Sequence, residues 1–213
     1  IVRAEYENFG ASPSNIGLGA VIITGDSAKK ENAAKVTAAI SELAGDFVVE
    51  TAGGDLEALL AGRGSGAEDM SLELSGKILN MDIGGGTTNA ALFYNGAVLD
   101  CFAAEIGGRG LKLGENGRVI YISDFLRTLI ESLRLPLAVG CVARFESLEA
   151  LALELAEILS GMTGAIPLKK DAEAFFIRHP YKGIKAELVT ISGGVAEFVY
   201  GQEVIDNMEK TIT

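Results

Sequence analysis

The stretch MDIGGGTTNAALFYNGAVLD, residues 81–100, places three consecutive glycines between an aspartate and two threonines. The segments around it, KILNMDI and NAALFYN, are rich in the apolar residues typical of strands, and the pair Asn95-Gly96 favours a tight hairpin turn to a third strand, AVLDCFAAEI. A turn that only reverses the chain needs no more than one such pair. We therefore expect residues 82–89 to have a purpose beyond reversing the chain.

The chemistry of this turn suits a phosphate group. Glycine has no Cβ, so its backbone N–H can approach a ligand closely, and several inward-pointing amides form a nest for anions. The two threonines add hydroxyl donors, and an aspartate at the end of an apolar strand is well placed to hold Mg²⁺ directly or through water. A hairpin turn without a ligand is the alternative. The predicted site residues in this segment are Asp82, Gly84, Gly85, Gly86, Thr87 and Thr88.

Other nucleotide and catalytic motifs do not occur in the chain. It has no GxxxxGK[ST], and no G-x-G-x-x-G opens a helix after a strand. Serine-nucleophile chemistry has no histidine in a suitable place. The GRGSG segment at residues 62–66 is interpreted as a loop.

Composition limits the class of protein. The 213 residues are 48% apolar and 22% charged, which predicts a globular chain with a large core. A net charge of −11 repels phosphate backbones, so we expect no nucleic-acid partner. No apolar run approaches eighteen residues, so we expect no membrane span, and we expect no signal peptide. The first residue is Ile1 rather than Met, which suggests an excised or processed chain.

The cysteines and the histidine give no metal site. Cys101 and Cys141 lie in apolar surroundings without metal-ligand spacing, which predicts reduced core thiols, with a disulfide between them left open. His179 is the only histidine and precedes a proline, so we expect it to be solvated. Histidine-rich zinc sites are excluded.

The sequence of the N-terminal third of the chain predicts strands that alternate with helices. Residues 1–15 are polar and are interpreted as a lead-in, followed by a strand over 18–24. A helix begins at Asp26 or Ser27 and ends near Leu43. A second strand over 46–52 then leads into a short helix with Leu56, Leu59 and Leu60 at helical spacing, which ends near Gly62. Residues 62–71 are expected to form a flexible loop and a subdomain boundary.

The remainder predicts a mixed sheet with helices after it. The glycine-rich residues 106–117 end the sheet, and a helix capped by Ser123 or Asp124 follows, to about Arg134. A longer helix runs from about 146 to 162, with a core-facing stripe of Leu148, Leu151, Leu155 and Ile158. Residues 164–182 are left unassigned. Residues 187–201 predict a strand, a double-glycine turn and the start of a helix. The expected class is therefore α/β with a mixed sheet.

The motifs resemble those of a known superfamily. DIGGGTTN is similar to the second phosphate motif of the actin-like ATPases, which include sugar kinases, heat-shock chaperone ATPases and actin. Residues 106–109, IGGR, and 190–195, TISGGV, are similar to that superfamily's later glycine pairs, the second of which is its adenosine motif. The resemblance implies an actin-like (ribonuclease H-like) fold, with a β-hairpin phosphate loop and flanking helices. It adds Gly107, Gly108, Gly193 and Gly194 to the expected nucleotide contacts.

Longer blocks resemble a narrower family, the EutA reactivating factors of ethanolamine ammonia-lyase. These blocks are VIITGDSAKKENAAKV, GDFVVETAGGDLEALLAGRGSGA and LNMDIGGGTTNAALF, and they extend the similarity over most of the chain. The resemblance implies an ATP-dependent chaperone that frees the adenosylcobalamin-dependent lyase of damaged cobalamin. Its expected cofactors are ATP or ADP with Mg²⁺, Asp82 being both metal contact and catalytic residue. The expected location is cytoplasmic, with association with a bacterial ethanolamine microcompartment as a further expectation.

Two departures from the superfamily pattern narrow these expectations. No counterpart of the first phosphate motif precedes Asp82, so residues 1–70 are interpreted as the end of a first lobe with its connecting helix, and 71–213 as the second, nucleotide-binding lobe. The superfamily's water-orienting glutamate aligns with Gly53, with Glu50 and Asp55 nearby, and the choice of carboxylate stays open. We expect weak ATPase activity from a full-length protein and weak or no activity from this chain alone. A small-molecule kinase and a filament or scaffold ATPase are the alternatives.

Overall fold

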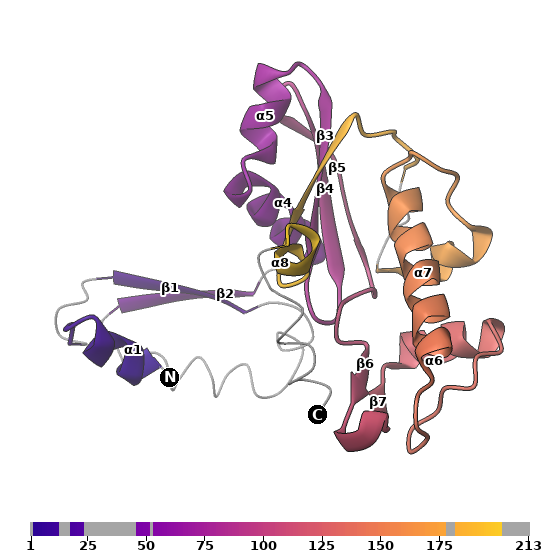
Figure 1. The fold of residues 1–213 in the computed structure, drawn as a ribbon. Coiled ribbons are helices and arrows are strands. Elements are labelled where there is room, and N and C mark those ends of the chain that lie inside the picture. Colours follow the sequence, from indigo (N-terminus) through magenta and orange to yellow (C-terminus); the bar gives the residue numbers. More distant parts are fainter. Residues whose placement is uncertain (1, 13–17, 24–45, 52, 178–181, 202–213) are drawn as a thin grey trace. The chain divides into compact units, whose positions relative to one another are not determined.

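A computed structural model describes residues 2–12, 18–23, 46–51, 53–177 and 182–201 (Figure 1). The chain divides into two compact units, Ile1–Glu57 and Ala58–Thr213. The functional division into two lobes at residue 70 stays a prediction.

The first unit contains helix α1 (Val2–Asn8) and the parallel strand pair β1 (Leu18–Ile23) and β2 (Asp46–Thr51). The prediction that residues 1–15 form only a polar, irregular lead-in is wrong for Val2–Asn8, which form α1. Arg, Ala and Glu favour a helix even in a polar segment. Both predicted strands are present. The helix expected between them, from Asp26 or Ser27 to Leu43, lies outside the described residues.

Two helices occupy the region around the predicted loop. Helix α4 (Gly54–Gly64) confirms the short leucine helix, but α5 (Ala67–Glu73) replaces the flexible loop predicted over 62–71. Only Ser65 and Gly66 separate the two helices, and Gly66 takes a left-handed φ of 79°. The several glycines suggest a loop, whereas a single left-handed residue is enough to end one helix and begin the next.

The second unit is built on a five-stranded sheet in the order β8-β5-β4-β3-β9. Strands β3 (Lys77–Ile83), β4 (Thr88–Tyr94) and β5 (Ala97–Ala104) form an antiparallel meander, with Asn95 and Gly96 at left-handed φ in the tight turn. Strand β9 (Leu188–Ser192) joins the free edge of β3 in parallel, and the two-residue β8 (Phe176–Ile177) pairs with β5. The predicted α/β class with a mixed sheet, a hairpin loop and flanking helices is confirmed.

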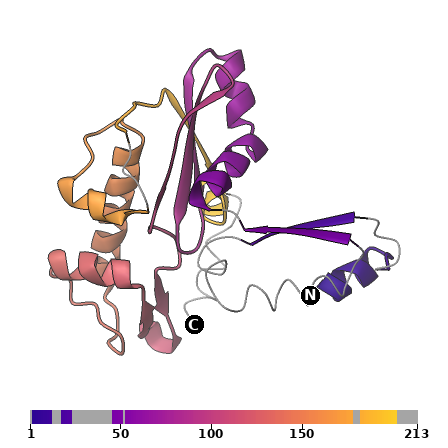
Figure 2. The ribbon, with the colours of Figure 1, turned by 180° about the vertical axis from the view of Figure 1, so that it is seen from behind.

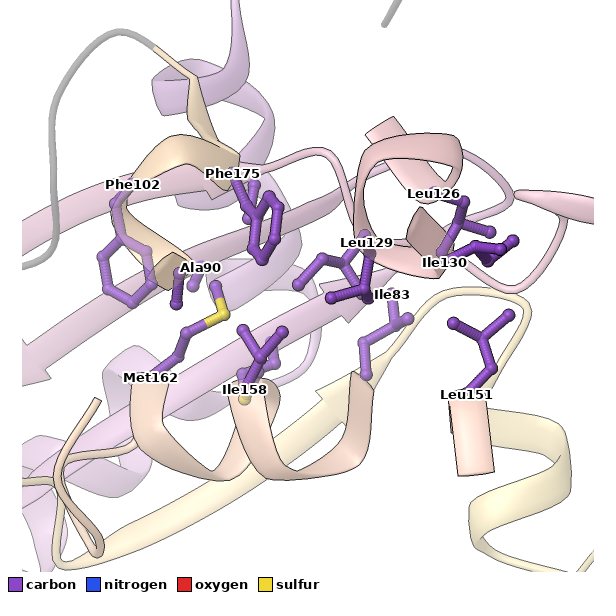
Figure 3. Close-up of a cluster of buried hydrophobic side chains, with 14 of the residues drawn as sticks. Ile83, Ala90, Phe102, Leu126, Leu129, Ile130, Leu151, Ile158, Met162 and Phe175 are labelled. Atoms are coloured by element: carbon purple, nitrogen blue, oxygen red, sulfur yellow. The ribbon is translucent and has the colours of Figure 1, made fainter. Parts of the chain in front are cut away.

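The larger core lies between this sheet and helices α6 (Asp124–Ser132) and α7 (Phe145–Met162). Ser123 caps α6 by accepting a hydrogen bond from the Leu126 amide, as its sequence predicts. Figure 3 shows Ile158 and Met162 of α7 pointing at the sheet together with Leu129 and Ile130 of α6. The stripe predicted on α7 is confirmed, because Leu151 and Ile158 are buried and Leu148 and Leu155 pack against the same cluster.

Short elements complete the unit. The hairpin β6 (Leu111–Leu113) and β7 (Val119–Ile122) encloses a 3₁₀ turn at Glu115–Gly117. The region left unassigned in the sequence contains a second 3₁₀ helix, Lys170–Phe175, which leads into β8. Helix α8 (Ala196–Val199) follows β9. Cys101 and Cys141 form no disulfide, and both are half-buried rather than fully in the core. His179 lies outside the described residues.

Helices α4 and α5 cover the opposite face of the sheet from α6 and α7 (Figures 1 and 2). Ala58, Ala67, Ile78, Ala91 and Phe93 form a small buried cluster on this face. Gly62 of α4 lies directly on the Phe93 ring, since a Cβ there would come within 2.4 Å of Phe93 Cε2. Only a residue without a side chain allows this contact between helix and strand.

The core of α7 provides a stability test. Replacing Ile158 with alanine removes a side chain that is 2% exposed, so we expect the free energy of unfolding to fall by about 2–5 kcal/mol. On the same helix, Leu153→Ala truncates a side chain that is 65% exposed and should change stability by less than about 0.5 kcal/mol. Urea denaturation of both variants measures the difference, and equal losses would contradict this assignment of the core.

Candidate functional site

The three-glycine segment forms the tip of the β3–β4 hairpin. The Gly84 amide donates to the Thr87 carbonyl at 2.9 Å, which leaves Gly85 and Gly86 exposed at the tip. Asp82 and Asn89 are paired across the two strands just before the turn. The predicted arrangement, an aspartate near the end of one strand followed by a glycine turn and a second strand, is therefore present.

The second glycine pair is docked on this tip. The amide of Gly108 donates to the Gly84 carbonyl at 2.9 Å, and that of Arg109 to the Gly85 carbonyl at 2.7 Å. A Cβ on Gly107 would lie 2.6 Å from the Gly85 carbonyl group, so the two backbones are in direct contact. This contact requires glycine at position 107.

The third glycine pair lies at the same end of the sheet. Gly193 follows β9 with φ +84°, and a Cβ there would lie 2.5 Å from the Ile83 carbonyl oxygen and 2.9 Å from Asp82 Oδ1. The Val195 amide donates to the same Ile83 carbonyl at 3.2 Å. A Cβ on Gly194 would meet no described atom within 4 Å, so its surroundings are open. The fold thus brings the three predicted glycine motifs together from positions far apart in the chain.

The hydrogen bonds to Gly84 and Gly85 set the direction of the next two amides. In a trans peptide the C=O and the following N–H point in opposite directions. Because the Gly84 and Gly85 carbonyls point at the 107–109 segment, the amides of Gly85 and Gly86 point away from it. Neither amide donates to an acceptor within the described part of the chain. Two adjacent unpaired amides at an exposed turn suit an anion.

The sheet face that α4 and α5 cover changes from apolar to polar side chains toward the end of the sheet that bears the glycine turns. Alternation along β3 places Asn80 and Asp82 on the same face as Ile78, and Asn89 of β4 shares it. Asn80 is fully buried and Asn89 is 5% exposed, whereas Asp82 is half-buried. The apolar half of the face packs on the helices, and the polar half leads to the glycine turns.

The sequence predicts that the Thr88 hydroxyl faces a phosphate group, whereas in the structure it bonds to the protein backbone. Its side chain is fully buried, and its hydroxyl donates to the Ile106 carbonyl at 2.8 Å. This bond joins the start of β4 to the segment that carries Gly107 and Gly108. A phosphate contact from Thr88 stays a prediction, while the half-buried Thr87 lies directly in the turn.

Sequence reasoning missed two neighbours of the site. The aliphatic part of the Arg109 side chain lies over Gly85, where a Cβ would come within 3.3 Å of its Cδ. Its position directly after Gly107-Gly108 was the available signal. Ser192 donates to Asp82 Oδ1 at 2.9 Å, a contact that only the pairing of β3 with β9 creates.

The described residues contain no cluster of three or more His, Cys, Asp or Glu side chains able to hold a metal ion. One or two carboxylates together with substrate phosphates and water are a common way of holding Mg²⁺, and Asp82 is the carboxylate predicted for that role. Glu50 of β2 and Asp55 of α4 belong to the first unit, and neither is established as a water-orienting residue. Within the described residues, no helix is long and apolar enough to span a membrane.

These features define a mixed α/β protein in which three glycine turns meet at one end of the central sheet. The chain belongs to the family of the ethanolamine utilisation protein EutA, whose model matches residues 1–211. It is 37% identical over 202 residues to the ethanolamine ammonia-lyase reactivase EutA of Salmonella typhimurium, and 32% identical over 214 residues to that of Escherichia coli. Each alignment covers 92% of this chain and 42% of the relative, so the chain spans less than half of their length.

Solved structures give weaker likenesses. MreB5 of Spiroplasma citri bound to ADP is 14% identical, with 94% of this chain and 64% of that chain covered and a TM-score of 0.41. A Ppx/GppA family member from Aquifex aeolicus is 19% identical, with 50% and 32% covered and a TM-score of 0.33. Scores at this level do not by themselves establish a common fold.

The crowding at Gly193 predicts a stability difference within one glycine pair. Gly193→Ala adds a methyl against the Ile83 carbonyl at left-handed φ, so we expect a loss of about 2 kcal/mol or more. Gly194→Ala adds the same methyl in open space and should change stability by less than about 0.5 kcal/mol. Chemical denaturation compares the two, and a Gly193→Ala variant as stable as Gly194→Ala would refute the close contact.

Proposed function

We propose that this chain is the nucleotide-binding part of an ATP-dependent chaperone that reactivates adenosylcobalamin-dependent ethanolamine ammonia-lyase. Two relatives carry the name of ethanolamine ammonia-lyase reactivase, and the chain is in their family. The observation that carries the nucleotide assignment is the convergence of three glycine turns on the end of β3 that bears Asp82. The order of these motifs supports the actin-like assignment.

The residues present fit a nucleotide with its Mg²⁺. The unpaired amides of Gly85 and Gly86, with the Thr87 hydroxyl, would hold phosphate oxygens, and Arg109 would add a positive charge. Asp82 would hold Mg²⁺, directly or through water, and the open Gly194 next to Gly193 leaves room for adenosine. Bound ATP would supply a γ-phosphate for in-line attack by water.

The protein's part in such hydrolysis is positioning and charge neutralisation. The hairpin amides and Asp82 lie at one end of the sheet, and the Arg109 backbone is hydrogen-bonded to the hairpin tip, so these three groups would act on one phosphate group. A nucleotide-dependent change between two arrangements of the protein would then act on the bound lyase. Because the chain covers 42% of its relatives, we assign complete activity to a polypeptide of the relatives' full length, and expect weak or no ATPase from these residues alone. We place this polypeptide in the bacterial cytoplasm, with the ethanolamine microcompartment as a further location.

A substitution at Gly86 can distinguish a phosphate-binding turn from a hairpin turn that binds no ligand. A methyl on Gly86 meets no atom of the described residues within 4 Å, so Gly86→Ala should leave stability unchanged. If phosphate approaches the backbone there, the methyl lengthens a hydrogen bond to a charged group, and MgADP affinity should fall at least about tenfold. Calorimetry measures the affinity. Gly64→Ala, also in open space but in α4, is the matched control, and unchanged affinity in Gly86→Ala would favour the plain hairpin.

The Asp82→Asn variant tests both the proposed Mg²⁺ contact and the proposed reactivation of ethanolamine ammonia-lyase. The full-length variant should lose most of the Mg²⁺ dependence of nucleotide binding and should fail to restore activity to inactivated lyase, because the amide carries no negative charge. Asp124→Asn changes a carboxylate on α6 that is 99% exposed and should behave as wild type. Full reactivation by Asp82→Asn would refute the assignment.

Assays on the full-length protein also distinguish the two alternative functions, a small-molecule kinase and a filament or scaffold ATPase. Transfer of labelled phosphate from ATP to a small acceptor would indicate a kinase, and ATP-dependent sedimentation would indicate a filament protein. We expect neither, and either result without lyase reactivation would overturn the proposal.

A further inference from the structure

A line of polar side chains crosses from strand β9 to strand β3 and ends at Asp82. Thr190 Oγ1 lies 2.8 Å from Asn80 Oδ1, Asn80 Nδ2 lies 3.1 Å from Ser192 Oγ, and Ser192 Oγ lies 2.9 Å from Asp82 Oδ1. The parallel register pairs Asn80 with Thr190 and Asp82 with Ser192. All four side chains therefore share the face of the sheet that becomes polar toward the glycine turns.

The hydrogen bonds in this line run in one direction. An ionised carboxylate only accepts, so Ser192 must donate its single proton to Asp82. Ser192 Oγ then accepts from the Asn80 amide, whose carbonyl oxygen accepts from Thr190. The reversed amide orientation would draw the Ser192 proton to Asn80 and leave two acceptors facing each other at 2.9 Å. Aligned bonds of this kind polarise and strengthen one another.

The surroundings allow little freedom to this line. Asn80 is fully buried, so its amide has no water to replace a lost partner. Gly193 lies against Asp82, because a Cβ there would be 2.9 Å from Oδ1. Oδ1 is therefore occupied by Ser192 and enclosed by Gly193, and Oδ2 is the oxygen left for a ligand.

We propose that Ser192 is a positioning residue for Asp82, with Asn80 and Thr190 holding Ser192 in turn. The inference rests on the proposed nucleotide function and deepens it: the line fixes the carboxylate so that one oxygen serves Mg²⁺ or its water. It also couples the two ends of the expected ligand site, because β9 leads into the Gly193-Gly194 turn and β3 carries the metal contact. A shift of β9 against β3 would then change metal binding.

The test compares ADP binding with Mg²⁺ and with EDTA in the full-length polypeptide. Ser192→Ala removes the donor to Asp82, so we expect MgADP affinity to fall about tenfold while affinity in EDTA stays unchanged. Ser192→Thr keeps the hydroxyl and should restore most of the loss. Thr190→Val, which removes only the first donor of the line, should give an intermediate loss of about threefold.

Ser71→Ala is the matched control for loss of a buried hydroxyl. Ser71 is fully buried in α5 and bonds to the Glu68 carbonyl and the Gly96 amide, at the other end of the β3–β5 meander. Its removal should affect stability and leave the ratio of the two affinities unchanged.

The outcomes separate the inference from the proposed function. Wild-type protein that binds no ADP would overturn both. Wild-type protein that binds MgADP, with Ser192→Ala weakened equally in EDTA or not at all, would overturn the positioning role alone. If circular dichroism shows Ser192→Ala to be unfolded, Thr190→Val decides, and an unchanged Mg²⁺ dependence in that variant would overturn the inference.

Discussion

The close contact of backbone on backbone at one end of the central sheet is the constraint on which the candidate site depends. Gly107 lies against the Gly85 carbonyl, and Gly193 lies against Ile83 and Asp82, at separations that leave no room for a Cβ. These contacts let the 107–109 segment hydrogen-bond to the hairpin tip. Those bonds in turn direct the amides of Gly85 and Gly86 outward. The unpaired donors are thus a consequence of packing and need no ligand to orient them.

The second organising feature is the division of one sheet face into an apolar and a polar half. The apolar half packs on α4 and α5, and the polar half contains Asn80, Asp82 and Asn89. A buried polar side chain destabilises a fold unless it is hydrogen-bonded. Asn80 meets this requirement with partners on β9, and Thr88 meets it with the Ile106 carbonyl. The polar groups near the site therefore also join β3 to β9 and β4 to the second glycine segment.

Much of the second unit was predictable, because its signals are local. The Asn95-Gly96 turn, the Ser123 cap and the apolar stripe of α7 each act over a few residues, and all are confirmed. The errors arose where a local signal has two structural solutions. The glycines of 62–66 suggested a loop, but one left-handed residue at Gly66 joins two helices, and the polar residues 2–8 form α1. Strands β6 and β7 escaped notice because very short strands carry little periodicity.

The sequence by itself determined the strands of the central sheet other than the two-residue β8, the glycine turn with its aspartate and the family resemblance. Each of these depends on residue types at short spacing or on similarity along the chain. Tertiary structure alone decided that Gly107 and Gly193 touch the hairpin, that the Thr88 hydroxyl turns to Ile106, and that Ser192 reaches Asp82. These contacts join residues up to about 110 positions apart, and they arise from the register of β9 on β3 and the fold of the chain after β5. Strand register is set by packing over the whole sheet, so no local pattern reveals it.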